Sequence, residues 1–360
     1  MKLKGFMKVI WSEKKYRTVF IICAILAVLI ILGAIAAAIY TKQKPQNFPT
    51  EAPATKQTEA PKVVSPLDGM PYSADIANRH PLAVMVENHP DARPQSGLIN
   101  ASIVYEAITE GGITRFMAVY GPTDAPEIGP IRSARLFYMD WVKEYDAFYA
   151  HAGGNEDALA KIGPYGIKNL DNNTGYFTRD SKGRNVASEH TLYSSTAKLY
   201  EYAKAQKFDT ATSSFETMKF KADGPADPAG KGTSIEFSSA SYKVDWAFDP
   251  LTNLYARTMA GVAHKDRTSG EQIKANNIII QVVERTFQPT GSYGSQNYVF
   301  KNIGSGKAYV LRDGKVLSAT WKKATLTSRT KYFDEAGVEI QLNPGKTWYE
   351  IIPPEVSPTF

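Results

Sequence analysis

The sequence predicts one membrane-spanning helix near the amino terminus, then an extracytoplasmic α/β domain and a smaller β-rich domain. Three observations carry this prediction. Residues 19–39 form an uncharged apolar run. Over residues 66–220, short apolar runs alternate with segments of helical period. After the Gly-, Pro- and Asp-rich stretch 221–234 the helical pattern disappears, so we take that stretch as a linker and residues 235–355 as the β-rich domain.

The apolar run VFIICAILAVLIILGAIAAAI is long enough to cross a membrane, which takes about twenty apolar residues. We assign residues 19–40 to the transmembrane helix. Residues 1–18 form a basic cytoplasmic segment, because positive charges gather before the run at Lys2, Lys4, Lys8, Lys14, Lys15 and Arg17. A signal peptide cleaved near residues 36–38 is the alternative, but the long apolar core favours a retained anchor.

The segment that follows the helix, residues 41–65, is rich in Pro, Thr and Lys, and we expect a flexible, solvated stalk. Cys23 is the only cysteine, so no intrachain disulfide can form. It lies inside the apolar run and follows Ile22, which does not suit a lipoprotein. The net charge of +6 comes largely from the basic head, so charge gives no support for a nucleic-acid partner.

Within the α/β domain, LAVMVEN (82–88) predicts a buried strand, and ASIVYEAIT with ITRFMAVYG predicts a hairpin around residues 110–112. Ser133 is expected to cap a helix over ARLFYMDWVKEY, and AFYAHAGG (147–154) is expected to be a strand. Helices are predicted after Asn155 and over residues 194–206. In the second domain the patterns are those of strands, with Asp313 and Gly314 in a hairpin turn.

The stretch IGPIRSAR contains the best candidate for a ligand site. Arg132 and Arg135 border Ser133 at the expected helix start, where free N–H groups and guanidinium forks suit a phosphate or carboxylate. Arg115, just after the hairpin turn, could join them. The alternative is that these arginines pair internally with Glu87, Glu106 or Glu110.

The remaining candidates are acids and histidines. Glu106 and Glu110, four residues apart, could act as a carboxylate pair on a glycosidic bond, although solvation or pairing with the arginines explains them as well. His151 is the best candidate for acid–base chemistry, and a core histidine is the alternative. Glu87, Asn88 and His190 are placed at a pocket rim. The five histidines show no metal-ligand spacing and no cofactor motif is present, so neither a metal nor a cofactor is predicted.

Several stretches together resemble one family. MVENHPDARPQSGL, IVYEAITEGGITRFMAVYG, IGPIRSAR, AHAGG and NNIIIQVVERTF with GSGKAYVLRDGKVLSATWKK are similar to the YerB-like envelope proteins, known as domain of unknown function 3048. The resemblance covers residues 66–354 and implies a membrane-attached, extracytoplasmic bacterial protein without an established activity. Familiar members are lipoproteins, whereas this chain carries an apolar helix. A fainter similarity to LytR-CpsA-Psr proteins implies arginines that hold a lipid pyrophosphate.

These observations leave three functions open. The first is a binding module for an anionic or saccharide cell-envelope ligand, either part of the cell wall or linked to a lipid, or for an envelope partner protein. The second is a cell-wall polymer enzyme, either a glycosyl hydrolase or a lipid-pyrophosphate-dependent glycopolymer transferase. The third is a scaffold whose charges are internal ion pairs. The expected location is the cell membrane, single-pass, with the amino terminus cytoplasmic and the bulk of the chain extracytoplasmic.

Overall fold

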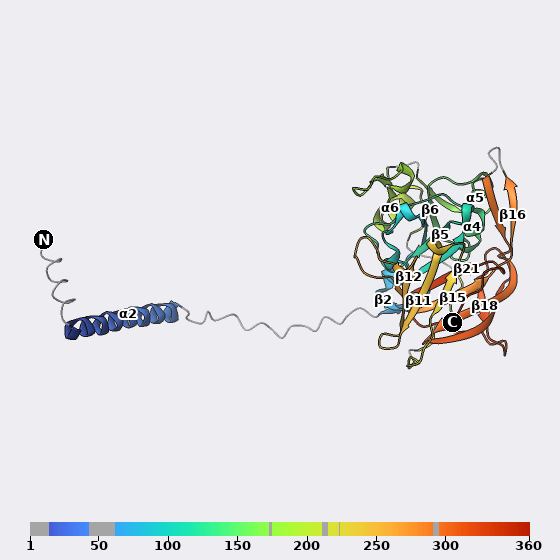
Figure 1. Ribbon diagram of the computed structural model, residues 1–360. Helices are drawn as coiled ribbons and strands as arrows, with labels where there is room; N and C mark the ends of the chain where they lie inside the picture. Colours follow the sequence, from blue (N-terminus) through green and yellow to red (C-terminus); the bar gives the residue numbers. More distant parts are fainter. Residues whose placement is uncertain (1–13, 43–61, 173–174, 211–214, 223, 291–294) are drawn as a thin grey trace. The chain divides into compact units, whose positions relative to one another are not determined.

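The computed structural model describes residues 14–42, 62–172, 175–210, 215–222, 224–290 and 295–360 (Figure 1). Contacts divide the chain into two compact units, Met1–Glu59 and Ala60–Phe360, and each is treated separately below. Most of the expected basic segment 1–18 and of the stalk 41–65 lies outside the described residues.

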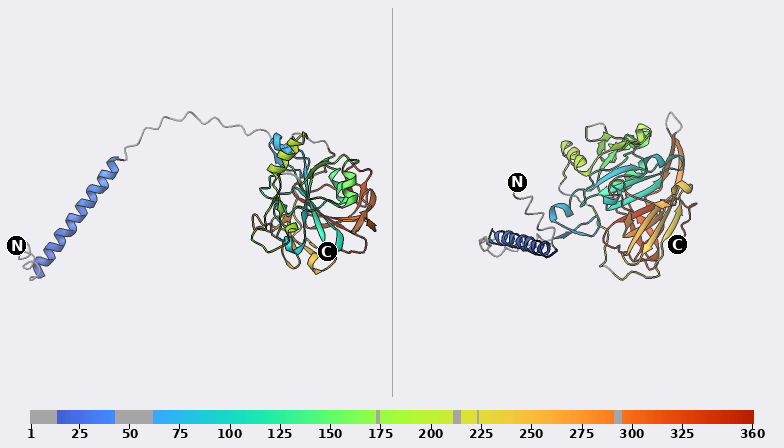
Figure 2. Two further views of the ribbon diagram at one scale, coloured as in Figure 1. Left: turned by 90° about the horizontal axis from the view of Figure 1, so that it is seen from above. Right: turned by 60° about the vertical axis from the view of Figure 1, so that its left-hand side comes forward.

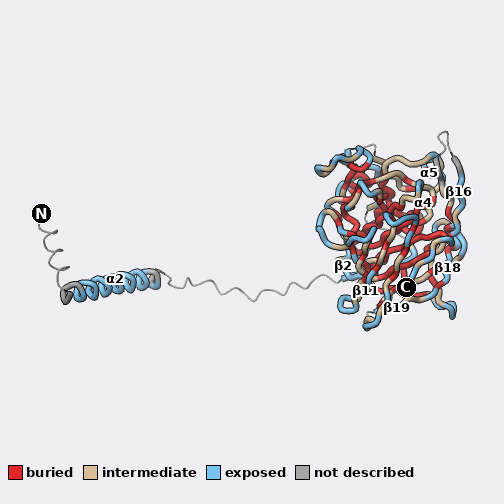
Figure 3. The backbone as a smooth tube through the Cα atoms, in the orientation of Figure 1, coloured by how far each residue is buried: buried red, intermediate tan, exposed pale blue. Residues whose placement is uncertain are grey.

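The first unit contains one long helix, α2 (Lys14–Lys42). Its stretch Thr18–Ala38 has 21 residues and a mean hydropathy of 3.3, so it is long and apolar enough to cross a membrane. The apolar side chains along this stretch are exposed, which Figure 3 shows as a pale blue tube. Exposed apolar surface all round a helix is typical of a segment that lies in lipid. The expected amino-terminal apolar helix is confirmed.

The second unit is built on one ten-stranded sheet. In spatial order its strands are β20 (Lys331–Phe333), β19 (Lys315–Lys323), β18 (Gly304–Arg312), β15 (Asn277–Val282), β21 (Thr347–Ile352), β4 (Ile103–Ile108), β5 (Thr114–Tyr120), β3 (Leu82–Glu87), β6 (Phe148–His151) and β7 (Lys168–Asp171). The pairs β15–β21, β21–β4, β3–β6 and β6–β7 are parallel, and the others are antiparallel. The sheet is therefore mixed.

The last strand along the chain, β21, joins the two halves of the sequence. It pairs on one side with β15 and on the other with β4, so that Glu350 lies directly opposite Glu106. The segments 66–220 and 235–355, which we expected to be separate domains, thus contribute to the same sheet. Figure 2 (right) shows the earlier strands, blue to green, above the later ones, orange to red. The stretch 221–234 connects the two halves rather than spacing them apart.

Layers cover both faces of this sheet. One face packs against a second sheet and against α6 (Thr196–Ala205), and the other packs against α4 (Leu136–Val142) and α5 (Glu156–Ile162). The second sheet consists of β10 (Thr233–Glu236), β11 (Lys243–Asp249), β12 (Leu254–Met259), β13 (Val262–Ala263) and β14 (Lys274–Ala275). Alternate residues of β3 enter the two cores, Val84 one and Met85 the other, as expected for a strand covered on both faces. Figure 3 shows the buried positions concentrated along these central strands.

Short elements complete the unit. The two-stranded pairs are β1 (Val63–Val64) with β2 (Pro71–Tyr72), β8 (Thr178–Arg179) with β9 (Leu192–Tyr193), and β16 (Arg285–Thr290) with β17 (Ser295–Phe300). The remaining helix is α3 (Ala74–Ala77). Single 3-10 turns are η1 (Pro90–Ala92), η2 (Leu98–Asn100), η3 (Glu110–Gly112), η4 (Ser188–His190) and η5 (Ala240–Tyr242).

Most predicted elements of the first half are confirmed. The strand at 82–88, the hairpin around 110–112 and the strand at 147–154 appear as β3, β4–β5 and β6. Asn155 caps α5 by accepting from the amide of Ala158 at 3.3 Å, and Ser195 caps α6 by accepting from the amide of Lys198 at 3.2 Å. The prediction for Ser133 is wrong, because α4 begins three residues later, at Leu136.

Lys346 lies where the two halves meet and predicts a pH dependence of stability. Its ammonium group is enclosed beneath η2 and donates to the carbonyls of Leu98 and Ile99, both at 2.7 Å. Burial lowers the pKa of Lys346 to about 7. Because the unfolded chain binds this proton up to its usual pKa near 10.5, the free energy of unfolding should rise from pH 7 to pH 9, by at most about 1.4 kcal/mol per pH unit.

Urea unfolding of Ala60–Phe360 at pH 7, 8 and 9 measures this slope. The Lys346→Met variant, which has no proton to lose, should have a flatter profile than the wild type. Equal slopes in the two proteins would contradict the assignment.

Candidate functional site

The chain segment 130–134 is held between the ends of β3 and β6. The amide of Arg132 donates to the carbonyl of Met85 at 3.0 Å, and its carbonyl accepts from the amide of Ala152 at 3.0 Å. One step earlier, the amide of Glu87 donates to the carbonyl of Pro130 at 2.9 Å. The backbone of Arg132 is therefore fixed from both sides, in an extended conformation that leaves its side chain at the strand ends.

Ser133 belongs to this extended segment and caps no helix. Its carbonyl accepts from Nη1 of Arg115 at 2.7 Å, and the position before α4 is occupied by Arg135, which makes no side-chain cap. Because the backbone groups of residues 130–134 are hydrogen-bonded to β3 and to the residues after β6, they cannot form helical hydrogen bonds, and the helix begins only at Leu136. The anion site that we expected from Ser133 at a helix amino terminus is accordingly not formed.

Arg135 and Arg115 bind the same carboxylate. Arg135 contacts both oxygens of Glu110, with Nε at 2.9 Å from Oε2, and Arg115 Nη2 lies 3.0 Å from Oε1. Burial alone would raise the pKa of Glu110, but the charges of Arg115 and Arg135 outweigh burial and lower this pKa to about 2. These two arginines are thus used inside the protein, as the alternative interpretation of the sequence had it.

Arg132 is paired differently. Its Nε lies 3.0 Å from Oε1 of Glu87, whose other oxygen is 2.9 Å from Nδ1 of His190. The Glu87 side chain is only 4% exposed, whereas that of Arg132 is 24% exposed. On the outer side, Nη2 of Arg132 makes a long contact of 3.4 Å with Glu189, whose side chain is 57% exposed. A buried carboxylate thus orients Arg132 from within and leaves its outer edge accessible.

Two adjoining cavities share Arg132 and Glu189. The first has a volume of about 210 Å³ and is lined by Glu87, Asn88, His89, Glu110, Ile113, Thr114, Arg115, Arg132, Glu189 and His190. The second has a volume of about 270 Å³ and is lined by Ile131, Arg132, Ser133, Ala152, Gly153, Asn172, Arg179, Glu189 and Leu192. We call the two together the Arg132 pocket. Most candidates from the sequence, including Glu87, Arg115 and His190, meet here; Arg135 reaches it only through Glu110.

Two candidates from the sequence lie elsewhere. His151 is fully buried, with Nδ1 at 2.7 Å from the carbonyl of Gly153 and Nε2 at 2.7 Å from the side chain of Asn169. It holds the glycine loop that lines the pocket and does not reach the pocket itself. Glu106 faces the second sheet, whereas Glu110 reaches toward α4, so the two carboxylates do not form an acid–base pair.

Glu106 is part of a closed ring of buried hydrogen bonds. It accepts from Nη2 of Arg257 on β12, and Arg257 Nη1 donates to Nδ1 of His264 at 2.6 Å. Nε2 of His264 lies 2.8 Å from Oε1 of Gln95, whose amide donates to Oδ1 of Asn88 at 2.9 Å. Asn88 closes the ring by donating to Glu106 at 3.2 Å. We call these five residues the Arg257 ring.

The Arg257 ring determines the position of the pocket wall. The amide of Gln95 also donates to the carbonyl of Glu87 at 2.9 Å, so the ring holds the end of β3. Burial, followed by the charge of Arg257, lowers the pKa of His264 well below its usual value. The imidazole of His264 therefore stays neutral and can accept a hydrogen bond from the guanidinium of Arg257. Asn88, which we predicted as a ligand residue, borders the cavity. Its side-chain amide, however, donates to Glu106 and accepts from Arg93.

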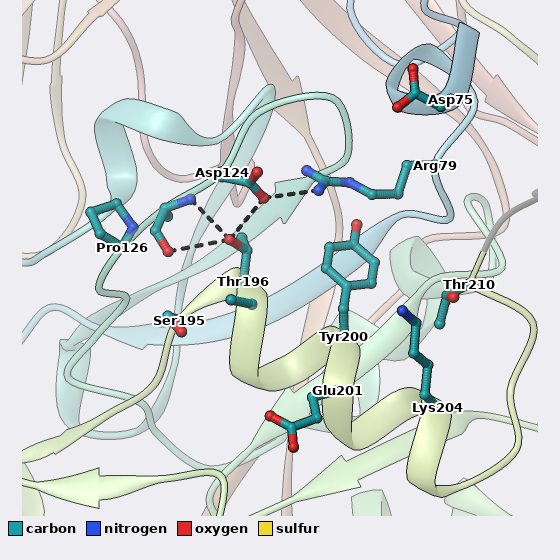
Figure 4. Close-up of a pocket in the computed structure, with 12 residues that line it drawn as sticks. Asp75, Arg79, Asp124, Pro126, Ser195, Thr196, Tyr200, Glu201, Lys204 and Thr210 are labelled. Carbon is teal, nitrogen blue, oxygen red and sulfur yellow. Dashed lines mark hydrogen bonds and ion pairs between the residues drawn. The ribbon is translucent and has the colours of Figure 1, made fainter.

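A larger cavity of about 720 Å³ lies at the amino end of α6 (Figure 4). Its arginine, Arg79, pairs with Asp124 at 2.9 Å, donates to the carbonyl of Gly121 and lies over the ring of Tyr200. Asp124 in turn accepts from Thr196 at 3.0 Å. These polar groups satisfy one another, so we regard the cavity as less suited to a charged ligand.

Sequence reasoning missed His89, Asp91, Arg179 and Glu189. His89 and Asp91 follow β3 directly, and their position after a buried strand was the signal that could have drawn attention to them. Arg179 is the last residue of β8 and Glu189 lies in η4, so both belong to the chain segment before β9, about 50 residues after Arg132. No local pattern in that segment indicates the contact.

The fold and the site define a class of protein: an apolar amino-terminal helix, followed by a sheet-rich body with a second sheet-rich region and a charged pocket at the strand ends. Residues 67–209 match the family model described as "Protein of unknown function (DUF3048) N-terminal domain", and residues 233–349 match the corresponding C-terminal domain. The chain belongs to this family.

Two comparisons with YerB of Bacillus subtilis agree. Over 303 residues the chain is 30% identical to YerB of strain 168, whose name describes it as a lipoprotein candidate; the match covers 82% of this chain and 87% of that protein. The crystal structure of YerB from Bacillus subtilis superimposes with a TM-score of 0.73 at 25% identity, covering 83% of this chain and all of the other. The similarity therefore extends over almost the whole second unit.

The pairing of Arg135 with Glu110 predicts an effect of pH on a variant. Arg135→Met keeps an apolar stem but removes the guanidinium, which should lower the free energy of unfolding at pH 7 by about 1–2 kcal/mol, a modest value because Glu110 is 35% exposed and solvent screens the pair. A carboxylate with a lowered pKa stabilises the fold above its unfolded pKa and loses that contribution as pH falls. The difference between variant and wild type should therefore shrink from pH 5 toward pH 2.

Urea unfolding of Ala60–Phe360 at pH 7, 4 and 3 provides the measurement, with Arg285→Met as a control because its partner Glu355 is 62% exposed. A deficit for Arg135→Met that stays constant with pH would refute the role of the ion pair.

Proposed function

We propose that this chain is a membrane-attached extracytoplasmic binding protein and that the Arg132 pocket binds the anionic group of a cell-envelope saccharide. One observation carries the proposal. Buried Glu87 orients Arg132 from within, and the Arg132 side chain is 24% exposed. Among the described residues, the outer edge of its guanidinium contacts only Glu189, at a long distance of 3.4 Å. Such an arginine is ready to exchange an exposed carboxylate for a carboxylate or phosphate of a ligand.

The exchange is favourable for physical reasons. The backbone of Arg132 is fixed at both its amide and its carbonyl, so little conformational entropy is lost when a ligand binds. Charge-assisted hydrogen bonds from a guanidinium to an oxyanion are short and roughly twice as strong as neutral ones. Arg179 lines the same cavity and adds a second positive charge, while Glu189, exposed to solvent, loses little on being displaced.

The other walls of the pocket suit hydroxyl groups. The polar residues Ser133 and Asn172, together with Gly153, line the 270 Å³ cavity. Groups of this kind donate to and accept from sugar hydroxyls, and the lining contains few large apolar side chains that would favour an apolar ligand. An acidic saccharide, with one carboxylate or phosphate among several hydroxyls, matches this combination.

Membrane attachment is supported by α2 and by the lipoprotein candidate among its relatives. We infer that the helix remains as an anchor, with the amino terminus cytoplasmic and Ala60–Phe360 outside, because the positive charges of the sequence precede the apolar stretch. An enzyme has less support. Glu106 and Glu110 serve separate ion pairs, and Arg135, which a pyrophosphate-binding mechanism would use, is bound to Glu110.

Isothermal titration of Ala60–Phe360 tests the proposal. The probes are a soluble muramic-acid-containing glycan fragment for the carboxylate, a glycerol-phosphate oligomer for the phosphate, and a neutral chitooligosaccharide. We expect one of the two acidic probes to bind and the neutral one to bind at least 10-fold more weakly. Arg132→Lys, which keeps a charge for Glu87 but lacks the planar fork, should weaken binding by about 10-fold without a change in melting temperature.

Lys307→Ala, on β18 in the other half of the sheet, is the matched control and should bind as the wild type does. Equal affinity of wild type and Arg132→Lys for a bound probe would exclude the Arg132 pocket as its site. Absence of binding by both acidic probes would overturn the proposed ligand class.

A further inference from the structure

Two histidines and an aspartate from separate segments meet beside the Arg132 pocket. His89 and Asp91 are on the loop after β3, and His190 ends η4, about a hundred residues later. One potential ligand atom from each lies within 4.8 Å of the others. The rings of His89 and His190 are stacked, with centroids 4.8 Å apart and an angle of 15° between their planes. From these residues we propose a binding site for a divalent transition metal ion, with zinc as the best fit.

The donor set suits that chemistry. Imidazole nitrogen and carboxylate oxygen are common ligands of Zn²⁺, and three protein ligands leave a coordination position for water or a ligand. Zinc ligands in a tetrahedral site are about 3.3 Å apart, so the donor atoms must draw together by up to about 1.5 Å. Because an imidazole nitrogen binds a metal in the plane of its ring, the His89 ring must also rotate out of its stack on His190. His89 and Asp91 can do this because their side chains are 33% and 58% exposed and lie on a short surface loop.

A second observation, independent of the clustering, supports a metal ligand at His190. Its Nδ1 is 2.9 Å from Oε2 of Glu87, whose side chain is 4% exposed. A histidine that ligates a metal through one nitrogen commonly donates its other N–H to a carboxylate, which fixes the tautomer and orients the ring. Glu87 occupies this outer position and leaves Nε2 of His190 as the coordinating atom.

The nitrogen of His89 is also available at little cost. Its Nδ1 accepts one long hydrogen bond of 3.2 Å from the amide of Asp91, at the exposed start of η1. Releasing that bond leaves the amide in contact with solvent rather than buried. The guanidinium of Arg132 is paired with the carboxylates of Glu87 and Glu189, and Asp91 lies beside His89. Three carboxylates around the cluster therefore offset the charge of an added divalent cation beside the one of Arg132.

The position of the site gives it a consequence for binding. Glu87 touches both His190 and Arg132, and His89 and His190 line the same 210 Å³ cavity as Arg132. A bound metal ion would present its open position to this cavity and add positive charge next to the arginine. The inference stands independently of the proposed ligand, because it rests on the side chains alone and is tested with the metal alone.

Titration of chelator-treated Ala60–Phe360 with Zn²⁺ by calorimetry tests the inference. We expect one ion per chain, and Co²⁺ in its place should give the intense visible absorption of a four-coordinate site with histidine ligands. His89→Ala, at a partly exposed position, and Asp91→Asn, at an exposed one, should each weaken Zn²⁺ binding by at least 10-fold while the melting temperature without metal stays unchanged. Glu87→Gln should weaken it by about 10-fold to 100-fold through the outer carboxylate.

Asp245→Asn, at a partly exposed carboxylate on β11, is the matched control and should bind Zn²⁺ as the wild type does. Two results would overturn the inference: absence of stoichiometric Zn²⁺ binding by the wild type, or binding that both His89→Ala and Asp91→Asn leave unchanged. If wild-type Ala60–Phe360 binds Zn²⁺ but neither acidic saccharide probe, the proposed function is refuted and the metal site is supported.

Discussion

The rest of the second unit depends on the buried ion pair between Arg257 and Glu106. Both side chains are fully buried, and an isolated charge at such a position would cost several kcal/mol, so each requires the other. The guanidinium lies between the rings of Trp348, Phe116 and Trp246, at 4.6, 5.5 and 5.5 Å from their centroids. Burial and the nearby charge of Glu106 raise the pKa of Glu350 well above its usual value, so the cluster holds one carboxylate for its one guanidinium.

This pair also connects the Arg132 pocket to the second half of the sequence. Arg257 comes from the second sheet, and the Arg257 ring ends on the carbonyl of Glu87 through Gln95. Glu87 in turn orients both Arg132 and His190. The proposed anion site and the proposed metal site therefore share one carboxylate at the end of β3. Among the described residues, those that line the Arg132 pocket all belong to the first half of the chain, yet contacts from the second half hold this carboxylate in place.

The sequence predicted the features that depend on neighbouring residues. The apolar run that begins β3, the hairpin, the cap at Asn155 and the helix start at Ser194 or Ser195 follow from local pattern. Most candidate residues at strand ends did converge, because strands of one sheet end near one another. Partnerships over long separations were not accessible. Nothing near Ser133 indicates that backbone bonds to Met85 and Gly153 replace the helix start, and nothing near Arg257 indicates a carboxylate 151 residues away. The proposed metal ligands, which come from two distant segments, likewise leave no spacing motif.

The free energy of unfolding of Arg257→Met in Ala60–Phe360, followed by tryptophan fluorescence and by circular dichroism, tests most directly the claim that this ion pair joins the two halves into one unit. The account predicts a loss of about 3–5 kcal/mol, because Glu106 is left buried without its partner. It also predicts one coincident transition for both signals, and partial recovery in Arg257→Met/Glu106→Gln, which removes the stranded charge. Stability close to that of the wild type, or separate transitions of the two halves, would contradict it.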